Sequence, residues 1–436
     1  EDHTKVLKEL KNPLVCVTSL ALGTYILTCS IITYSIATKM SGLQNQRKVS
    51  VEGDIPKEIC RMFWKGNVKF EDIYSFKVEG SIEEANVMNE VRQRVKEQAR
   101  VWWSMEAAKG AGWYLQAQYW KDNGNFVLSL SISTLKNTIV LKRLIRQGIP
   151  PVLRPNLWFM ASGAAKKRST VPHSYYQDLI RAVEGMVTPS TLQIDQDLSR
   201  TFPTHPWLDT EEGHASLRRI LVAYSFRDSH VGYCQGLNFV AALLLLVMQT
   251  EEDAFWMLAV LLENVLFNDC YADNLFGSHV EQMVFKDFLA KMFPRLARHL
   301  EKLDFDVSLV ATEWFLCLFA KSLPSETTMR IWDVLFSEGT NVLFRVALAI
   351  FKINEDQLLA AEQVGDVISI LRHSAHHAFD PDALLKVAFE KIGSMTTNCI
   401  TKHRKRRQAA VTAELDKRLR RLSSWERDKL SSELGN

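Results

Sequence analysis

Two side chains near the middle of the chain, Arg200 and Gln235, have the properties of groups that assist phosphoryl transfer. They lie in two short motifs, Ile194-x-x-Asp197-x-x-Arg200 and Tyr233-Cys234-Gln235-Gly236. An arginine stays protonated and presents a planar fork of donors that matches phosphate oxygens. A glutamine amide both donates and accepts hydrogen bonds, which suits it to orient a water that attacks a phosphoryl group. Neither group is a nucleophile or a general base, so both would act by positioning and by charge stabilisation.

The segment between the two motifs predicts a single helix. Asp209-x-x-Glu212 is typical of a helix start, and Leu217, Leu221 and Tyr224 then share one face. One helix between the motifs places the arginine and the glutamine on neighbouring loops or helix ends.

Arg200 also has a structural interpretation. Asp195 and Asp197 precede it closely, and taken alone such an arginine is more often the partner of a nearby carboxylate. Two carboxylates this close could also form an acid/base pair, but nothing else in the chain is typical of a hydrolase site.

The two motifs resemble the signature motifs of the TBC domain, which activates Rab GTPases. Further stretches in the expected order also match this family: Gly148-Ile149-Pro150, Leu153-Arg154-x-x-x-Trp158, Glu252-Asp253-Ala254-Phe255-Trp256, Trp314-Phe315, Leu323-Pro324, and Ile331-Trp332-Asp333 with Gly339. The resemblance covers residues 145–360, about half of the chain.

The resemblance implies an all-α domain of two helical lobes that is a regulator of an enzyme, not an enzyme itself. Arg200 would be the arginine finger, and Gln235 would be a glutamine finger in place of the GTPase's own water-orienting glutamine. Asp197 is expected to position Arg200, Tyr233 to pack beside the finger, and Gly236 to allow close backbone approach. The partner would be a GTP-bound Rab protein in membrane trafficking. That partner carries the GTP and Mg²⁺, so no cofactor of the chain's own is expected.

A binding module is the alternative function: a TBC fold that binds GTP-loaded Rab proteins as a scaffold without catalysis. Arg154 has two interpretations as well, as the partner of an acid inside the domain or as a contact to the GTPase, and we favour the first. The family's tryptophans are expected in the core, because large aromatic side chains dominate protein interiors.

Composition fits an intracellular globular protein. The 436 residues are 47% hydrophobic and 24% charged, and the net charge of +3 gives no global attraction to nucleic acid. The seven cysteines are scattered without a Cys-x-x-Cys pair, which indicates free thiols in a reducing compartment. No glycine is followed by lysine, so the chain lacks a P-loop and is not expected to bind GTP alone. We therefore expect a cytoplasmic protein, peripheral on endomembranes or anchored to them.

Two segments precede the domain. Residues 1–53 contain an apolar stretch, 14–37, that is long enough to span a bilayer. A membrane anchor and translated non-coding sequence upstream of a start at Met40 stay equally open, with a signal peptide behind both. Residues 54–144 form a small mixed leader region, in which a capping box at Ser81 and Glu84 predicts an amphipathic helix over 82–107.

Two segments follow the domain. Residues 361–400 predict closing helices, and residues 401–436 predict a basic tail helix. The tail opens with a basic run at 402–407, Lys-His-Arg-Lys-Arg-Arg, which could be a nuclear signal, a nucleic-acid contact, a patch for anionic lipid or a solvated helix face. We favour an anionic membrane surface or a partner helix over nucleic acid.

Overall fold

A computed structural model describes residues 67–116 and 132–434. The apolar stretch 14–37 and the rest of the segment 1–53 lie outside the described residues. Within the described residues, no helix is both long enough and apolar enough to cross a bilayer.

The described part of the chain begins with a small hairpin, which a long helix follows. Strands β1 (Val68–Glu71) and β2 (Lys77–Gly80) pair antiparallel, with Val68 opposite Gly80. We call residues 67–80 the leader hairpin. Helix α4 (Ile82–Lys109) follows, and the predicted capping box is present: Ser81 Oγ accepts from the Glu84 amide, and the Glu84 carboxylate accepts from the Ser81 amide.

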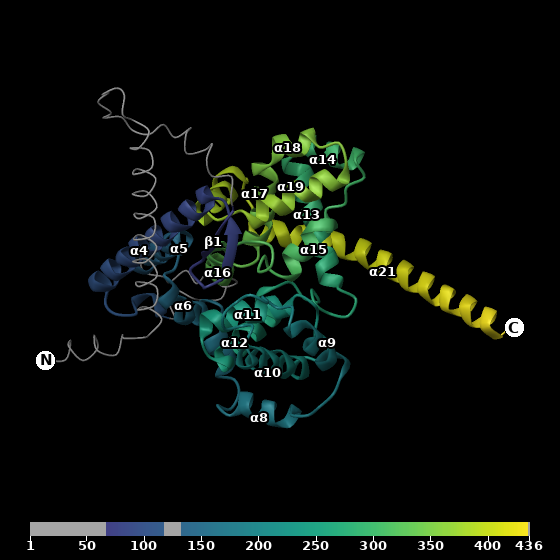
Figure 1. Ribbon diagram of the computed structural model, residues 1–436, viewed down its shortest axis with the longest axis horizontal. Coiled ribbons are helices and arrows are strands. Elements are labelled where there is room, and N and C mark those ends of the chain that lie inside the picture. The colour runs from purple at the N-terminus through teal and green to yellow at the C-terminus, as the bar shows by residue number, and fades with distance from the viewer. Residues whose placement is uncertain (1–66, 117–131, 435–436) are drawn as a thin grey trace, which may run out of the picture. The chain divides into compact units, whose positions relative to one another are not determined.

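The remaining elements are helical, as the sequence predicts, and form two lobes (Figure 1). After a 3₁₀ turn at Trp113–Leu115 come α5 (Ile132–Gln147) and a second 3₁₀ turn at Pro151–Leu153. The first lobe contains α6 (Arg154–Ala161), α7 (Ala164–Arg168), α8 (Tyr175–Val183), α9 (Pro189–Leu198), α10 (Glu211–Arg227), α11 (Leu237–Met248) and α12 (Glu251–Val260) with a π-helical turn at Leu261–Val265. The second lobe contains α13 (Phe276–Met292), α14 (Pro294–Lys302), α15 (Ser308–Leu316), α16 (Ser325–Glu338), α17 (Asn341–Ile353), α18 (Glu355–Ala360), α19 (Val364–His376) and α20 (Pro381–Lys386) with a π-helical turn at Val387–Lys391. Helix α21 (Thr397–Leu434) follows.

The core of the first lobe is organised around α10, which packs against α8, α9, α11 and α12. Helix α11 is apolar on nearly every side, and ten of its twelve residues are buried. An all-round apolar helix of this length is stable only inside a core. Helix α10 connects the two motifs, because the first lies at the end of α9 and the second lies just before α11.

Aromatic residues fill the core in both lobes, as expected from the family's motifs. The tryptophans of these motifs are each at most 2% exposed: Trp158, Trp256, Trp314 and Trp332. Trp158 and Trp332 lie on different lobes and their rings are 6.0 Å apart, so the lobes share one apolar interior.

A buried ion cluster lies at the junction of the lobes. The Arg154 guanidinium is fully buried and donates to Glu326 at 2.8 Å and to Asp333 at 3.1 Å. Trp158 and the Ile149 amide donate to the same Asp333 carboxylate. The interpretation of Arg154 as the partner of an internal acid is therefore confirmed.

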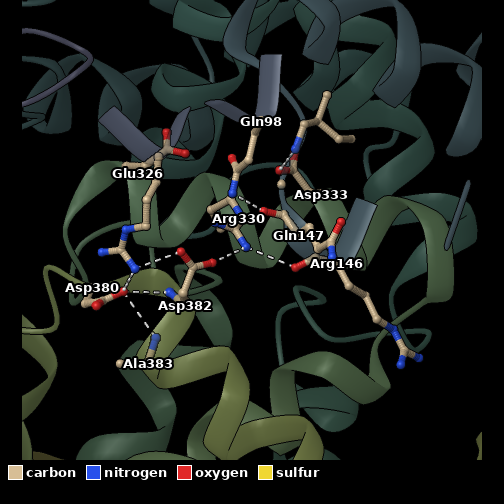
Figure 2. Close-up of polar contacts among 12 residues, drawn as sticks. Gln98, Arg146, Gln147, Glu326, Arg330, Asp333, Asp380, Asp382 and Ala383 are labelled. Atoms are coloured by element: carbon tan, nitrogen blue, oxygen red, sulfur yellow. Dashed lines mark hydrogen bonds and ion pairs between the residues drawn. The ribbon is translucent and has the colours of Figure 1, made fainter. Parts of the chain in front are cut away.

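Helix α4 packs on the end of α5 and on α20 through a second polar cluster. Its Trp102 indole donates to the Gly148 carbonyl at 2.9 Å, and Arg94 contacts Asp382 at 2.9 Å. Arg330 donates to the same aspartate at 2.8 Å and to the backbone carbonyl of Arg146 at 3.0 Å, and Figure 2 shows Arg330 between Asp382 and Arg146. Through these contacts the leader region is attached to the second lobe.

The basic run lies in helix α21, which begins at Thr397 and packs against α13. Two of its five lysine and arginine side chains are paired with carboxylates there. Arg404 is paired with Glu281, and Arg407 and His403 contact Asp287. Acids of α13 thus face this side of the helix and contact these three residues. The exposed members of the run are Lys402, Lys405 and Arg406.

Candidate functional site

The predicted arginine lies just after the end of α9, in a loop that we call the arginine loop (residues 199–205). The Arg200 side chain is 55% exposed, whereas the Asp197 side chain is 1% exposed. Arg200 Nε donates to Asp197 Oδ1 at 2.8 Å, and its Nη2 contacts the same oxygen. The buried carboxylate thus fixes the inner edge of the guanidinium, while Nη1 is not part of this pairing.

Asp195 and Asp197 have separate partners. Asp195 is on the exposed side of α9 and pairs with Arg218 of α10 at 2.6 Å. The two carboxylates therefore do not face each other as an acid/base pair, and Asp197 is the partner that the structural interpretation of Arg200 required.

The predicted glutamine lies in a second loop, residues 231–236, which we call the glutamine loop. Gln235 is exposed, and the flanking Tyr233 and Gly236 are buried. Tyr233 donates its hydroxyl proton to Asp197 Oδ2 at 2.6 Å. Burial and this hydrogen bond raise the pKa of the tyrosine well above its ordinary value, so it remains a neutral donor. One carboxylate therefore contacts both loops.

Gly236 satisfies a steric requirement at the start of α11. Its φ of 114° lies in the region that favours glycine. A Cβ at this position would stand 3.2 Å from the Leu316 carbonyl oxygen and 3.3 Å from Cys317 Sγ of the second lobe. The close backbone approach expected from the sequence is thus present, between the glutamine loop and the end of α15.

Asn238 makes a second link between the loops, which the sequence reasoning missed. It is fully buried, and its Nδ2 donates to Thr201 Oγ1 at 2.7 Å while its Oδ1 accepts from the Gly236 amide at 3.0 Å. Thr201 Oγ1 in turn donates to the Asp197 carbonyl at 2.6 Å. The available signal was a polar asparagine at the start of an otherwise apolar helix, because a buried amide must find hydrogen-bond partners.

The exposed groups of the site are suited to binding and orientation. Burial raises the pKa of the neighbouring Cys234 thiol to about 11, so it is a thiol at neutral pH and a poor nucleophile. Among the described residues, no group of three or more His, Cys, Asp or Glu side chains could hold a metal ion. The arrangement therefore presents a cationic fork and an amide on two cross-linked loops.

A helical two-lobed fold with this pair of loops defines a TBC domain, and comparison with known proteins agrees. Residues 151–359 match the family model of the Rab-GTPase-TBC domain. The chain is similar to the crystal structure of the Chlamydomonas flagellar RabGAP TBC domain, with 34% identity and a TM-score of 0.62 over 74% of this chain and 100% of that one. The chain belongs to the Rab-GTPase-TBC domain family.

Curated relatives are longer proteins. TBC1 domain family member 2A of Mus musculus is 36% identical over 65% of this chain and 31% of its own length. TBC1 domain family member 2B of Xenopus tropicalis is 38% identical over 57% of this chain and 27% of its own. The chain thus spans about a third of the length of the curated relatives it matches.

Proposed function

We propose that the chain is a GTPase-activating protein for a Rab-type small GTPase in membrane trafficking. One observation carries the proposal: the exposed Arg200 is oriented by the buried Asp197, which also accepts from Tyr233 of the loop that presents Gln235. An arginine with a purely structural role would not need to lie on a loop that is hydrogen-bonded to a second loop with an exposed glutamine.

In this mechanism the chain supplies two side chains in trans to a GTP-bound partner, which brings its own nucleotide and Mg²⁺. Arg200 donates to the phosphoryl oxygens, where negative charge develops in the transition state. Gln235 orients the attacking water through its amide. An arginine finger accelerates GTP hydrolysis roughly 10³- to 10⁵-fold, which corresponds to about 4–7 kcal/mol of barrier.

The test is single-turnover GTP hydrolysis by a panel of Rab proteins, with the wild-type chain and with Arg200→Ala, Arg200→Lys and Gln235→Ala. Both Arg200 variants are expected to lose at least about a hundredfold in rate, a conservative reading of the arginine-finger range. Gln235→Ala should lose catalysis as well, because the attacking water then lacks its orienting amide. Lysine fails because it keeps the charge but lacks the planar fork. Arg181→Ala is the matched control, since Arg181 is also an exposed arginine paired with an aspartate three residues earlier.

Two results would contradict the proposal. No acceleration of any Rab protein by the wild-type chain removes the activity, and near-full activity of Arg200→Lys removes the arginine finger. Rab binding without acceleration would instead support the alternative, a TBC-fold scaffold for GTP-loaded Rab proteins. The variants should keep wild-type stability, because substitutions of exposed side chains usually change it by within about 0.5 kcal/mol.

We also propose that the exposed half of the basic run contacts an anionic membrane surface. Lys402, Lys405 and Arg406 are exposed on α21, whereas Arg404 and Arg407 pair with acids of α13. Each cation near an anionic surface contributes about 1 kcal/mol of attraction. Sedimentation with phosphatidylserine vesicles should lose binding in the triple glutamine variant at these positions. Equal binding of the wild-type chain to neutral phosphatidylcholine vesicles would exclude this role.

A further inference from the structure

The turn of the leader hairpin, residues 72–76, packs directly on the arginine loop. The Phe76 ring lies 4.9 Å from the Phe202 ring at an angle of 73°, and 4.7 Å from the His205 ring. The edge-to-face pair of Phe76 and Phe202 is attractive beyond the area that it buries. Phe202 and His205 are therefore both in contact with a residue that lies more than a hundred positions earlier in the chain.

A hydrogen bond joins the same two segments. His205 Nδ1 accepts from the amides of Trp207 and Leu208 at 3.2 and 3.0 Å, so that nitrogen carries no proton. Nε2 therefore carries the proton of the neutral ring and donates to the Tyr74 carbonyl at 2.9 Å. His205 is 4% exposed, and its orientation is fixed at both nitrogens.

The turn itself is attached to the second lobe. The buried Asp72 carboxylate accepts from the amides of Tyr74 and Phe76 at 2.8 and 2.9 Å, which sets the shape of the turn. The same carboxylate accepts from the Ser325 hydroxyl at the start of α16. The Tyr74 hydroxyl accepts from Arg154 in the buried ion cluster. The turn is thus held from one side by the lobe junction and contacts the arginine loop on the other.

The arginine loop has a conformation that needs such support. Phe202 has a φ of 52°, in the left-handed region that a bulky aromatic residue rarely adopts. A residue in this region keeps its conformation only when its surroundings over-determine it. The Phe202 ring is packed between Phe76 and Phe239, whose ring lies 5.2 Å away. Without Phe76, one of these two supports is lost.

We infer that the turn of the leader hairpin is a positioning element for the arginine finger, and that Phe76 is its principal positioning residue. This inference rests on the proposed function, since it assigns Phe76 a role through Arg200. The hairpin lies outside residues 151–359, the part that matches the family model. The catalytic loop of this chain therefore depends on a segment beyond the matched domain.

The test compares Phe76→Ala with Phe70→Ala in the full chain. Phe70 is the matched control, because it belongs to the same hairpin and is also partly buried, but it packs on Phe379 at 5.8 Å. Phe76→Ala should lower kcat of Rab GTP hydrolysis roughly three- to tenfold, the range for loss of one aromatic pair. KM for the Rab protein should change less than about twofold, because the finger stabilises the transition state while the unchanged docking surface binds the ground state. Phe76→Tyr, which keeps the ring, should recover kcat.

Amide hydrogen exchange of the chain alone gives a second readout that needs no GTPase. Phe76→Ala should speed exchange selectively at residues 201–208, which include the His205 amide bonded to the Phe202 carbonyl. Phe70→Ala should leave that segment unchanged. Unchanged exchange in Phe76→Ala, equal changes in both variants, or an unaltered kcat overturns the inference. If the wild-type chain activates no Rab protein, the proposed function fails, and the exchange data alone decide whether the hairpin orders the loop.

Discussion

Asp197 offers the sharpest test of how the site is assembled, because one buried carboxylate contacts both loops. Asp197→Ala removes the acceptor of the Tyr233 hydroxyl and leaves that donor buried. A buried hydrogen bond to a charged group contributes about 1.5–3 kcal/mol. The pair with Arg200 adds less than about 1 kcal/mol, because the arginine is 55% exposed and solvent screens it. We therefore expect Asp197→Ala to lower the free energy of unfolding by about 2–4 kcal/mol.

The same change should reduce catalysis by loss of orientation. Arg200 keeps its charge in Asp197→Ala but loses the acceptor that fixes its inner edge. Misplacement of a catalytic group by about 1 Å can cost roughly a hundredfold in rate. On this basis we expect a loss of about ten- to a hundredfold, smaller than that of Arg200→Ala. Asp197→Asn should lie between wild type and alanine, because its amide accepts from Arg200 and donates to Tyr233 but lacks the charge.

Urea unfolding measures the change in stability, and single-turnover GTP hydrolysis well below the melting temperature measures the rate. Asp195→Ala is the matched control, two residues away on α9 with an exposed partner, Arg218. It should change stability by within about 0.5 kcal/mol. A fully folded Asp197→Ala chain that accelerates hydrolysis like wild type would refute the positioning role of this carboxylate.

Four further changes have definite expectations. Asn238→Ala leaves the buried Gly236 amide without its acceptor and removes one of the two hydrogen bonds of the Thr201 hydroxyl. Urea unfolding should therefore show a loss of about 2–4 kcal/mol, and GTP hydrolysis should slow. Gly236→Ala combines a φ of 114° with a 3.2 Å contact to a backbone oxygen, so its melting temperature should fall and its hydrolysis rate with it. Arg154→Met leaves two buried carboxylates uncompensated and should destabilise the chain by about 3–5 kcal/mol in urea. Asp72→Asn tests the pH dependence of stability, because burial raises the pKa of Asp72 from 3.8 to about 6. The contribution of Asp72 to the free energy of unfolding is therefore fully present below pH 3.8, where the side chain is protonated, and is lost as the pH rises through about 6. The wild-type chain should lose about 3 kcal/mol relative to this variant across that window in pH-dependent urea unfolding.

Local signals in the sequence were sufficient for most helices. The capping box at Ser81 and the apolar run from Asn238 to Met248 correspond to the start of α4 and to α11, because both effects act within a few turns of the chain. Helix α8, which begins at Tyr175, ends at Val183. Gly185 follows with a φ of 72°, and a glycine in that conformation terminates a helix.

The assembly of the site could be predicted from the sequence only in part. Arg200 and Gln235 were predicted from their residue types and from the family motifs, and Asp197 and Tyr233 were expected beside them. The geometry that joins them depends on Asn238 and on the leader hairpin. The hairpin's contacts join residues separated by 131 positions (Tyr74 and His205) and by 253 positions (Asp72 and Ser325). No periodicity or local composition encodes such pairings, since they arise only when the two lobes have packed.

The basic run illustrates the same limit in electrostatics. Six consecutive positions on a helix occupy every side of it, so such a run cannot face one partner with all its charges. Helical spacing alone separates His403, Arg404 and Arg407 from Lys402, Lys405 and Arg406, because residues three and four apart share a face. That this face is neutralised follows only from Glu281 and Asp287 of α13, which lie more than a hundred residues earlier. A charge count over the run therefore overstates the positive charge available to a membrane, and the exposed cations are the ones that a binding experiment has to change.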